Sequence, residues 1–198
     1  MKIRVFKKEK YGFTLIEMLV AVGLFTVVIV ITLTAILSII DFQRKVTAFQ
    51  NIQNNLNFAL EVISKDLKTG DKYYCGLNSF DMPTGGANDI IPRSCLSGGQ
   101  IITFRNSNSD KITYRFLSGR IERIVNDGQV FILTSININL NENVSKFYVV
   151  NAEDELKMDY QPRITITIGA TSGVKDKTTE TFNLQTTISQ LVLNEYSL

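Results

Sequence analysis

Histidine is absent from the 198-residue sequence. Without it, neither a Ser-His-Asp triad nor a Cys-His pair can form, and the usual general base near pH 7 is missing. Neither a G-x-x-x-x-G-K-[ST] nor a G-x-G-x-x-G phosphate-binding loop occurs. The sequence therefore predicts that the chain is not an enzyme, and no cofactor is expected.

Cysteine is scarce, and acidic residues form only one notable cluster. Cys75 and Cys95 are the two cysteines, too few to fill a zinc shell without carboxylates. In an oxidising compartment they could form one disulfide worth about 3 kcal/mol, and two free thiols are the alternative. Residues 153–155 and Asp159 supply oxygen donors for calcium, but their spacing fits no known loop and favours a solvated turn. No metal site is expected.

Charge and proline are missing from a long apolar run. From Phe13 to Ile40 the only ionisable side chain is Glu17, and no proline occurs before Pro83. A helix over these 28 residues is roughly 42 Å long, enough to cross a hydrocarbon core of about 30 Å. A charge inside such a span costs about 2–3 kcal/mol at the bilayer centre and less near the interface, so Glu17 needs a partner or a purpose.

Two ordinary interpretations of this run fit it incompletely. A secretory signal peptide has a shorter apolar core and a small-x-small cleavage site, which is not evident around residues 35–38. A plain single-pass anchor explains the length and the flanking charge. It does not explain why Gly12-Phe13 and Glu17 stand where they do.

The segment GFTLIEMLVAV, residues 12–22, resembles the class III signal of type IV pilins and pseudopilins without a gap. The resemblance covers about residues 10–40. It implies that prepilin peptidase cuts after Gly12, that Phe13 becomes the N-methylated first residue, and that Glu17 acts in assembly. It also implies the partners: prepilin peptidase, other pilin or pseudopilin subunits, an inner-membrane assembly platform, and membrane lipid before assembly.

The charge distribution indicates the orientation of the chain. The predicted leader, residues 1–12, contains five basic residues: Lys2, Arg4, Lys7, Lys8 and Lys10. By the positive-inside rule this leader stays in the cytoplasm, and the C-terminal part is exported. Removing it changes the formal charge from +2 to −2, so nucleic acid is not expected as a partner. The predicted location is the cytoplasmic (inner) membrane as a single-pass protein, then a pilus or pseudopilus at the cell surface or in the periplasm.

Beyond the transmembrane or filament-core helix of residues 13–40, the pattern becomes amphipathic. Apolar side chains recur every three or four residues at Phe42, Val46, Phe49, Ile52, Leu56, Leu60, Ile63 and Leu67. This stripe predicts that residues 41–69 continue the helix, with one face packed on a sheet. A coiled coil is the alternative. Gly70 is typical of a helix stop.

Residues 70–198 are expected to form an exported globular domain. Glycine and proline in residues 70–99 predict a long loop, which is either a surface loop tied down elsewhere or a subunit contact. From about residue 100, short alternating runs predict an antiparallel sheet. Strands are expected at 101–105, 111–116, 121–125, 130–133, 144–150, 163–168 and 181–191, with a hairpin turn at Ser118-Gly119. The predicted fold class is α+β and pilin-like: a long N-terminal helix packed on a C-terminal antiparallel sheet.

The function implied by the resemblance is structural: a minor pilin or pseudopilin in a type IV pilus or a type II secretion pseudopilus. The run at residues 59–67 and the later alternating strands are most similar to a J-type minor pseudopilin. The absence of a helix-breaking proline also favours a minor subunit. The alternative is a membrane-anchored exported binding module, such as a pilus-tip adhesin or a DNA- or protein-binding subunit, that does not polymerise in bulk.

Overall fold

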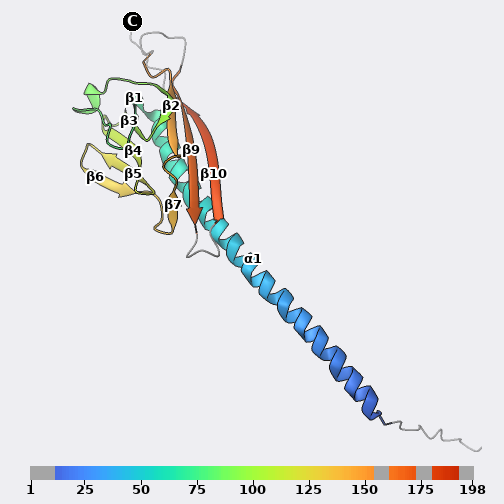
Figure 1. Ribbon diagram of the computed structural model, residues 1–198. Helices are drawn as coiled ribbons and strands as arrows, with labels where there is room; N and C mark the ends of the chain where they lie inside the picture. The colour runs from blue at the N-terminus through green and yellow to red at the C-terminus, as the bar shows by residue number, and fades with distance from the viewer. Residues whose placement is uncertain (1–11, 154–160, 173–179, 192–198) are drawn as a thin grey trace, which may run out of the picture. The chain divides into compact units, whose positions relative to one another are not determined.

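The structure is a computed structural model that describes residues 12–153, 161–172 and 180–191. The described chain falls into two compact units that divide between Arg44 and Lys45. The described part of the first unit consists of residues 12–14 and the N-terminal part of one long helix, and the second unit contains the rest of that helix and the strands of the described residues (Figure 1). The predicted leader lies outside the described residues except for Gly12.

Helix α1 runs from Leu15 to Thr69 without a break. The sequence predicts a helix over 13–40 that continues over 41–69, so the observed start lies two residues later and the observed end coincides with the prediction. Gly70 follows the last turn, and the buried Tyr73 hydroxyl donates 2.6 Å hydrogen bonds to the Leu67 and Gly70 carbonyl oxygens. These bonds satisfy carbonyls that a helix end leaves without partners. Burial raises the pKa of Tyr73 well above its ordinary value, so the hydroxyl stays protonated and donates.

The described residues contain ten strands, which form two antiparallel sheets. The first sheet has the order β1-β3-β4-β5-β6, with β1 (Asp71–Gly76), β3 (Ile101–Arg105), β4 (Lys111–Leu117), β5 (Arg120–Val125) and β6 (Gln129–Ile132). The second has the order β10-β9-β8-β2, with β2 (Cys95–Gly99), β8 (Lys146–Val150), β9 (Arg163–Ser172) and β10 (Glu180–Ser189); β7 (Ile138–Leu140) also pairs with β9. A short 3-10 helix, η1 (Ala87–Asp89), precedes β2.

Most predicted strands are present with small shifts at their ends. The Ser118-Gly119 turn between β4 and β5 is also confirmed, and both of its residues have positive φ, 52° and 71°. A two-residue hairpin loop with two positive φ angles matches the twist of its strands, and glycine adopts that conformation at little cost. Strand β9 continues four residues beyond the predicted Ile168.

The predicted start of the sheet near residue 100 and the prediction of one sheet are wrong. Strands β1 and β2 lie inside residues 70–99, where a loop was expected, and each belongs to a different sheet. In β1 the Tyr73 and Cys75 side chains are buried while Lys72 and Tyr74 are half-buried, the alternation of a strand. This strand is short and borders a glycine-rich stretch, which hid its period. The three-residue β7 was not predicted.

The core of the second unit fills the space around the C-terminal part of α1. From Ile52 onward, the helix side chains on one face are buried. They are Ile52, Leu56, Ala59, Leu60, Ile63 and Leu67. They share one cluster with Phe104 and Tyr114 of the first sheet and with Phe147 and Ile166 of the second. The predicted packing of the amphipathic stripe on a sheet is therefore confirmed from Ile52 onward. Earlier in the stripe, Phe49 is 40% exposed, and its ring packs edge-to-face with the ring of Phe182, with centroids 5.4 Å apart.

A polar network joins α1 to the first sheet beside this core. One carboxylate oxygen of Asp66 accepts hydrogen bonds from the Tyr114 hydroxyl at 2.7 Å and from Arg123 Nε at 3.0 Å. Burial and the neighbouring Asp66 carboxylate raise the pKa of Tyr114 well above its ordinary value. The tyrosine therefore remains a donor, and the network fixes the rotation of the helix against β4 and β5.

Replacing Ile63 by alanine is expected to destabilise the second unit by about 3 kcal/mol, because this fully buried side chain would leave a cavity between helix and sheet. The measurement is chemical unfolding of the full-length protein in detergent, monitored through the signals of its tyrosines. Phe58→Ala is the matched control on the same helix, since Phe58 is 60% exposed. Equal losses for the two variants would contradict the described packing.

Candidate functional site

The predicted cleavage point lies just before the helix. Gly12, Phe13 and Thr14 are not helical, and α1 begins at Leu15. Phe13 is 80% exposed, and a Cβ added to Gly12 would meet no atom within 4 Å. The peptide bond between Gly12 and Phe13 is therefore open to another protein, and nothing in the described chain itself requires glycine at position 12.

A reciprocal pair of hydrogen bonds closes the start of α1. The Glu17 amide donates to Thr14 Oγ1 at 3.3 Å, and the Thr14 amide donates to Glu17 Oε2 at 3.4 Å. The Thr14 carbonyl accepts the first helical bond, from the Met18 amide at 3.2 Å. This arrangement is a capping box with Thr14 as N-cap. This capping box is not among the predictions from the sequence, although the spacing Thr-x-x-Glu before an apolar run is its usual signal.

Glu17 therefore has a local partner as well as a predicted role. Its carboxylate lies in the first turn of α1, where the helix dipole favours a negative charge. No ion pair involves Glu17 within the described part of the chain. The Thr14 amide supplies a hydrogen bond but no positive charge. The negative charge of the carboxylate is therefore not neutralised and can still pair with a cation.

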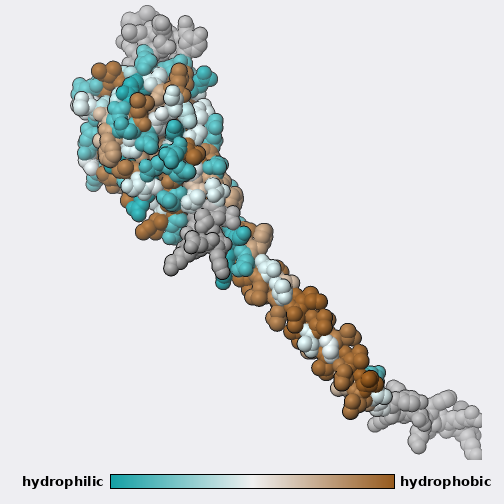
Figure 2. All heavy atoms as spheres, viewed as in Figure 1, coloured by the Kyte–Doolittle hydropathy of each residue, from teal (hydrophilic) through white to brown (hydrophobic). Residues whose placement is uncertain are grey.

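The rest of the first unit presents an apolar surface. The large apolar side chains from Phe13 to Ile40 are all exposed in the isolated chain, and Figure 2 shows them in brown along this part of α1. An exposed apolar surface of this extent marks contact with membrane or protein. By length and composition, α1 is the one helix of the described residues that could cross a membrane.

The polar side chains within the apolar run bond to the helix itself. The hydroxyls of Thr26, Thr32, Thr34 and Ser38 each donate to the carbonyl four residues earlier, at 2.8–3.1 Å. Such bonds satisfy hydroxyl groups without water. Beyond the helix start, this segment can therefore be surrounded equally well by lipid or by apolar protein side chains.

Cys75 and Cys95 form the disulfide expected from the sequence. The bond connects β1 to β2, and thus the first sheet to the second, with the two Cα atoms 5.8 Å apart. An isolated bridge between Tyr74 and Arg93 is the neighbouring backbone link, with the Cys75 amide donating to the Arg93 carbonyl at 3.0 Å. The loop residues between the cysteines are thus closed by a covalent bond between two sheet edges.

Asp81 holds the first part of this closed loop. Its carboxylate accepts hydrogen bonds from the Tyr74 hydroxyl at 2.8 Å and the Leu77 amide at 3.0 Å, and it pairs with Arg93. The Arg93 guanidinium also lies over the Tyr74 ring, 4.4 Å from its centroid. Partial burial alone would raise the pKa of Asp81, but the hydrogen bonds from Leu77, Arg93 and Tyr74 outweigh it and lower that pKa.

A buried lysine holds the second part. Lys111 of β4 is 2% exposed, and its ammonium group donates to the carbonyl oxygens of Pro83 and Gly85 at 2.5 and 3.1 Å. Asp127 supplies the balancing charge at 2.9 Å. The sequence leaves this segment open as a tied-down loop or a subunit contact, and the structure shows it tied down at several points.

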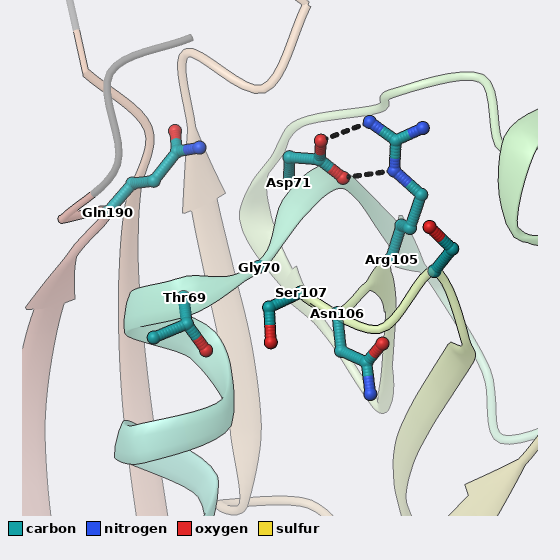
Figure 3. A pocket seen from close by; sticks show the side chains of 8 residues that line it. Thr69, Gly70, Asp71, Arg105, Asn106, Ser107 and Gln190 are labelled. Atoms are coloured by element: carbon teal, nitrogen blue, oxygen red, sulfur yellow. Dashed lines mark hydrogen bonds and ion pairs between the residues drawn. The ribbon is translucent and has the colours of Figure 1, made fainter.

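A shallow polar pocket of about 320 Å³ lies at the C-terminal end of α1 (Figure 3). It is lined by Thr69, Gly70, Asp71, Arg105, Asn106, Ser107, Ser109 and Gln190. Asp71 and Arg105 bond to each other through both carboxylate oxygens. None of the residues predicted to act in function lies here.

The structure describes only part of the acidic cluster considered for calcium. Residues 154–160 lie outside the described residues, and the Glu153 carboxylate accepts a hydrogen bond from the Ser94 amide at 2.9 Å. Within the described ranges, no group of three or more Cys, Asp or Glu side chains could hold a metal ion.

Comparison with known proteins identifies the segment at the helix start. Residues 7–33 match the family model described as the prokaryotic N-terminal methylation motif. No curated protein and no solved structure matches the chain. The motif indicates a type IV pilin-like substrate of prepilin peptidase, and it covers Gly12, Phe13, Glu17 and most of the apolar run. The α+β architecture, a long N-terminal helix on antiparallel sheets, agrees with that class.

Acid is expected to weaken the fold partly through Asp81. Because its folded pKa is lowered, its stabilising contribution is complete above the unfolded value of about 3.9 and is lost as pH falls through the folded pKa. Asp81→Asn should therefore cost about 1–2 kcal/mol at pH 7 and progressively less below about pH 4. The measurement is the unfolding free energy at a series of pH values from 7 to 2. The control is Asp41→Asn, which alters the exposed Asp41–Arg44 ion pair at 3.7 Å and should change the unfolding free energy little. A cost of Asp81→Asn that does not vary with pH would contradict the role given to the Asp81 carboxylate.

Proposed function

We propose that this chain is a minor pilin or pseudopilin: a subunit cut by prepilin peptidase between Gly12 and Phe13 and assembled into a type IV pilus or a type II secretion pseudopilus. The observation that carries the proposal is the helix start. An exposed, non-helical Gly12-Phe13 precedes a capped apolar helix with one carboxylate, inside the matched motif.

Assembly follows from the charge that cleavage creates. Hydrolysis at Gly12 would leave an α-amino group on Phe13, one helical turn from the Glu17 carboxylate. The two opposite charges attract strongly in an apolar environment, within one chain or between neighbouring chains. Between chains, this pairing would set the axial register of one helix against the next, with the apolar runs forming the filament core.

The exported part supports the same function. A disulfide between Cys75 and Cys95 is stable where the surroundings are oxidising, as outside the cytoplasm. The proposed topology therefore keeps residues 1–12 in the cytoplasm, places residues 13–40 in the membrane or filament core, and exports the rest. Among subunit types, the unbroken helix without proline favours a minor subunit, and the J-type pseudopilin is the form we favour.

Gly12→Val is expected to abolish processing, because the peptidase must bind backbone beside a residue without a side chain. A Cβ added at Gly12 meets no atom within 4 Å, so folding should be unaffected. The intact mass of the protein isolated from membranes measures cleavage. Gly23→Val is the control, since a Cβ at Gly23 likewise meets no atom within 4 Å. Normal cleavage of the Gly12 variant would refute the processing site.

Glu17→Gln should prevent assembly while leaving the protein processed and in the membrane. Glutamine at this position can still complete a capping box, so the variant removes the charge and keeps the hydrogen bond. Breaking a buried ion pair costs about 3–5 kcal/mol, and 1.4 kcal/mol is already tenfold, so incorporation should fall by more than about tenfold.

The measurement for Glu17 is the amount of subunit in sheared filaments relative to membranes. Glu17→Ala, which removes both charge and cap, is the companion variant and should fail at least as severely. Filament incorporation of the Gln variant at the level of the unmodified protein would show that the carboxylate is only a cap. It would also favour the alternative of an anchored binding module that does not polymerise.

A further inference from the structure

We propose that Thr14 is a positioning residue for proteolysis: its side chain fixes the start of α1 at Leu15 and so keeps the Gly12–Phe13 peptide bond outside the helix. This inference rests on the proposed function, because it concerns the same cleavage. Two separate observations concern this bond: the hydrogen bonds between Thr14 and Glu17 that begin the helix just after it, and the motif match that includes it.

The hydrogen bonds at the helix start decide which carbonyls stay free. In an α-helix extended by two residues, the Ile16 amide would donate to the Gly12 carbonyl and the Glu17 amide to the Phe13 carbonyl. In the structure the Glu17 amide instead donates to Thr14 Oγ1, and the Thr14 amide is held by the Glu17 carboxylate. The Thr14 hydroxyl therefore competes directly with growth of the helix toward the leader.

The chemistry of cleavage explains why this matters. Water adds to the Gly12 carbonyl carbon, the bond from that carbon to the Phe13 nitrogen breaks, Gly12 leaves as a carboxylate, and Phe13 gains an amine. The Gly12 carbonyl must be free to be polarised by the peptidase. A carbonyl that accepts a helical hydrogen bond must first lose it, which lowers the fraction of precursor ready for cleavage.

The residues before Thr14 offer little other resistance to helix growth. Glycine at position 12 disfavours helix, but Phe13 does not, and the adjoining apolar helix is long and continuous. Replacing an N-cap threonine by a residue without a capping group is expected to slow cleavage about fivefold, equivalent to about 1 kcal/mol.

The test is the initial rate of cleavage of the full-length precursor in membrane vesicles by added prepilin peptidase. Thr14→Ser and Thr14→Asn retain a capping group and should be cut at nearly the original rate. Thr14→Val, which keeps the shape, and Thr14→Ala, which is smaller, should both be about fivefold slower. Thr26→Val removes a hydroxyl bonded within the helix and should have no effect.

This pattern separates positioning from direct contact with the peptidase. If Thr14 were read by its shape, Val would be cut well and Asn poorly, and that result would overturn the proposal. Equal rates for all Thr14 variants would overturn it too, while leaving the proposed function intact. Failure of the peptidase to cut the unmodified precursor would instead refute the proposed function.

Hydrogen exchange of the uncut precursor gives a readout that does not depend on the peptidase. The Ile16 amide should become more protected in Thr14→Val than in the unmodified chain, because it would then donate to the Gly12 carbonyl. Unchanged protection of Ile16 in that variant would contradict the proposed competition.

Discussion

One carboxylate in the otherwise uncharged run from Phe13 to Ile40 is the constraint on which the first unit depends. Glu17 is the sole ionisable side chain among residues 13–40, and an unpaired charge in apolar surroundings is costly. The capping box reduces this cost within the chain, because the Thr14 amide donates a hydrogen bond to the carboxylate. A neutral donor leaves the charge itself uncompensated. The same group therefore defines the helix start and remains available for a cation, without any change in the helix.

The second unit depends on a different constraint, the joining of two sheets around one helix face. The helix stripe from Ile52 to Leu67 contributes to a core that both sheets share. The disulfide between β1 and β2 links the two sheets, and an isolated bridge between Tyr74 and Arg93 lies beside it. The cations of Lys111 and Arg93 then hold the closed loop. The covalent bond and these ion pairs therefore hold a segment that forms no strand between β1 and β2.

The elements that could be predicted from sequence are those with a sustained period. Helix α1 was predicted within two residues at each end because its pattern is long and free of proline. The strands after Gln100 alternate clearly and were also found. Strand β1 was missed because its six residues precede a glycine- and proline-containing stretch, and β2 because Cys95–Gly99 lacks a strand-like composition. The division into two sheets depends on pairings distant in sequence, which no local pattern encodes. At the candidate site, Gly12, Phe13 and Glu17 were predicted through a resemblance, whereas Thr14 was not predicted even though its capping signal is local.

The internal bonding of α1 bears on how a subunit could leave the membrane. Its hydroxyls donate to helix carbonyls, and its other side chains between Met18 and Ile40 are apolar. Lipid tails and leucine-rich helix surfaces are nearly equal as apolar surroundings, so transfer between them changes the free energy of these side chains little. In the proposed function, the Phe13 amine and the Glu17 carboxylate are the groups whose surroundings change most. The energetic difference between a subunit in lipid and one in a filament is then concentrated at the helix start, where pairing between chains can decide it.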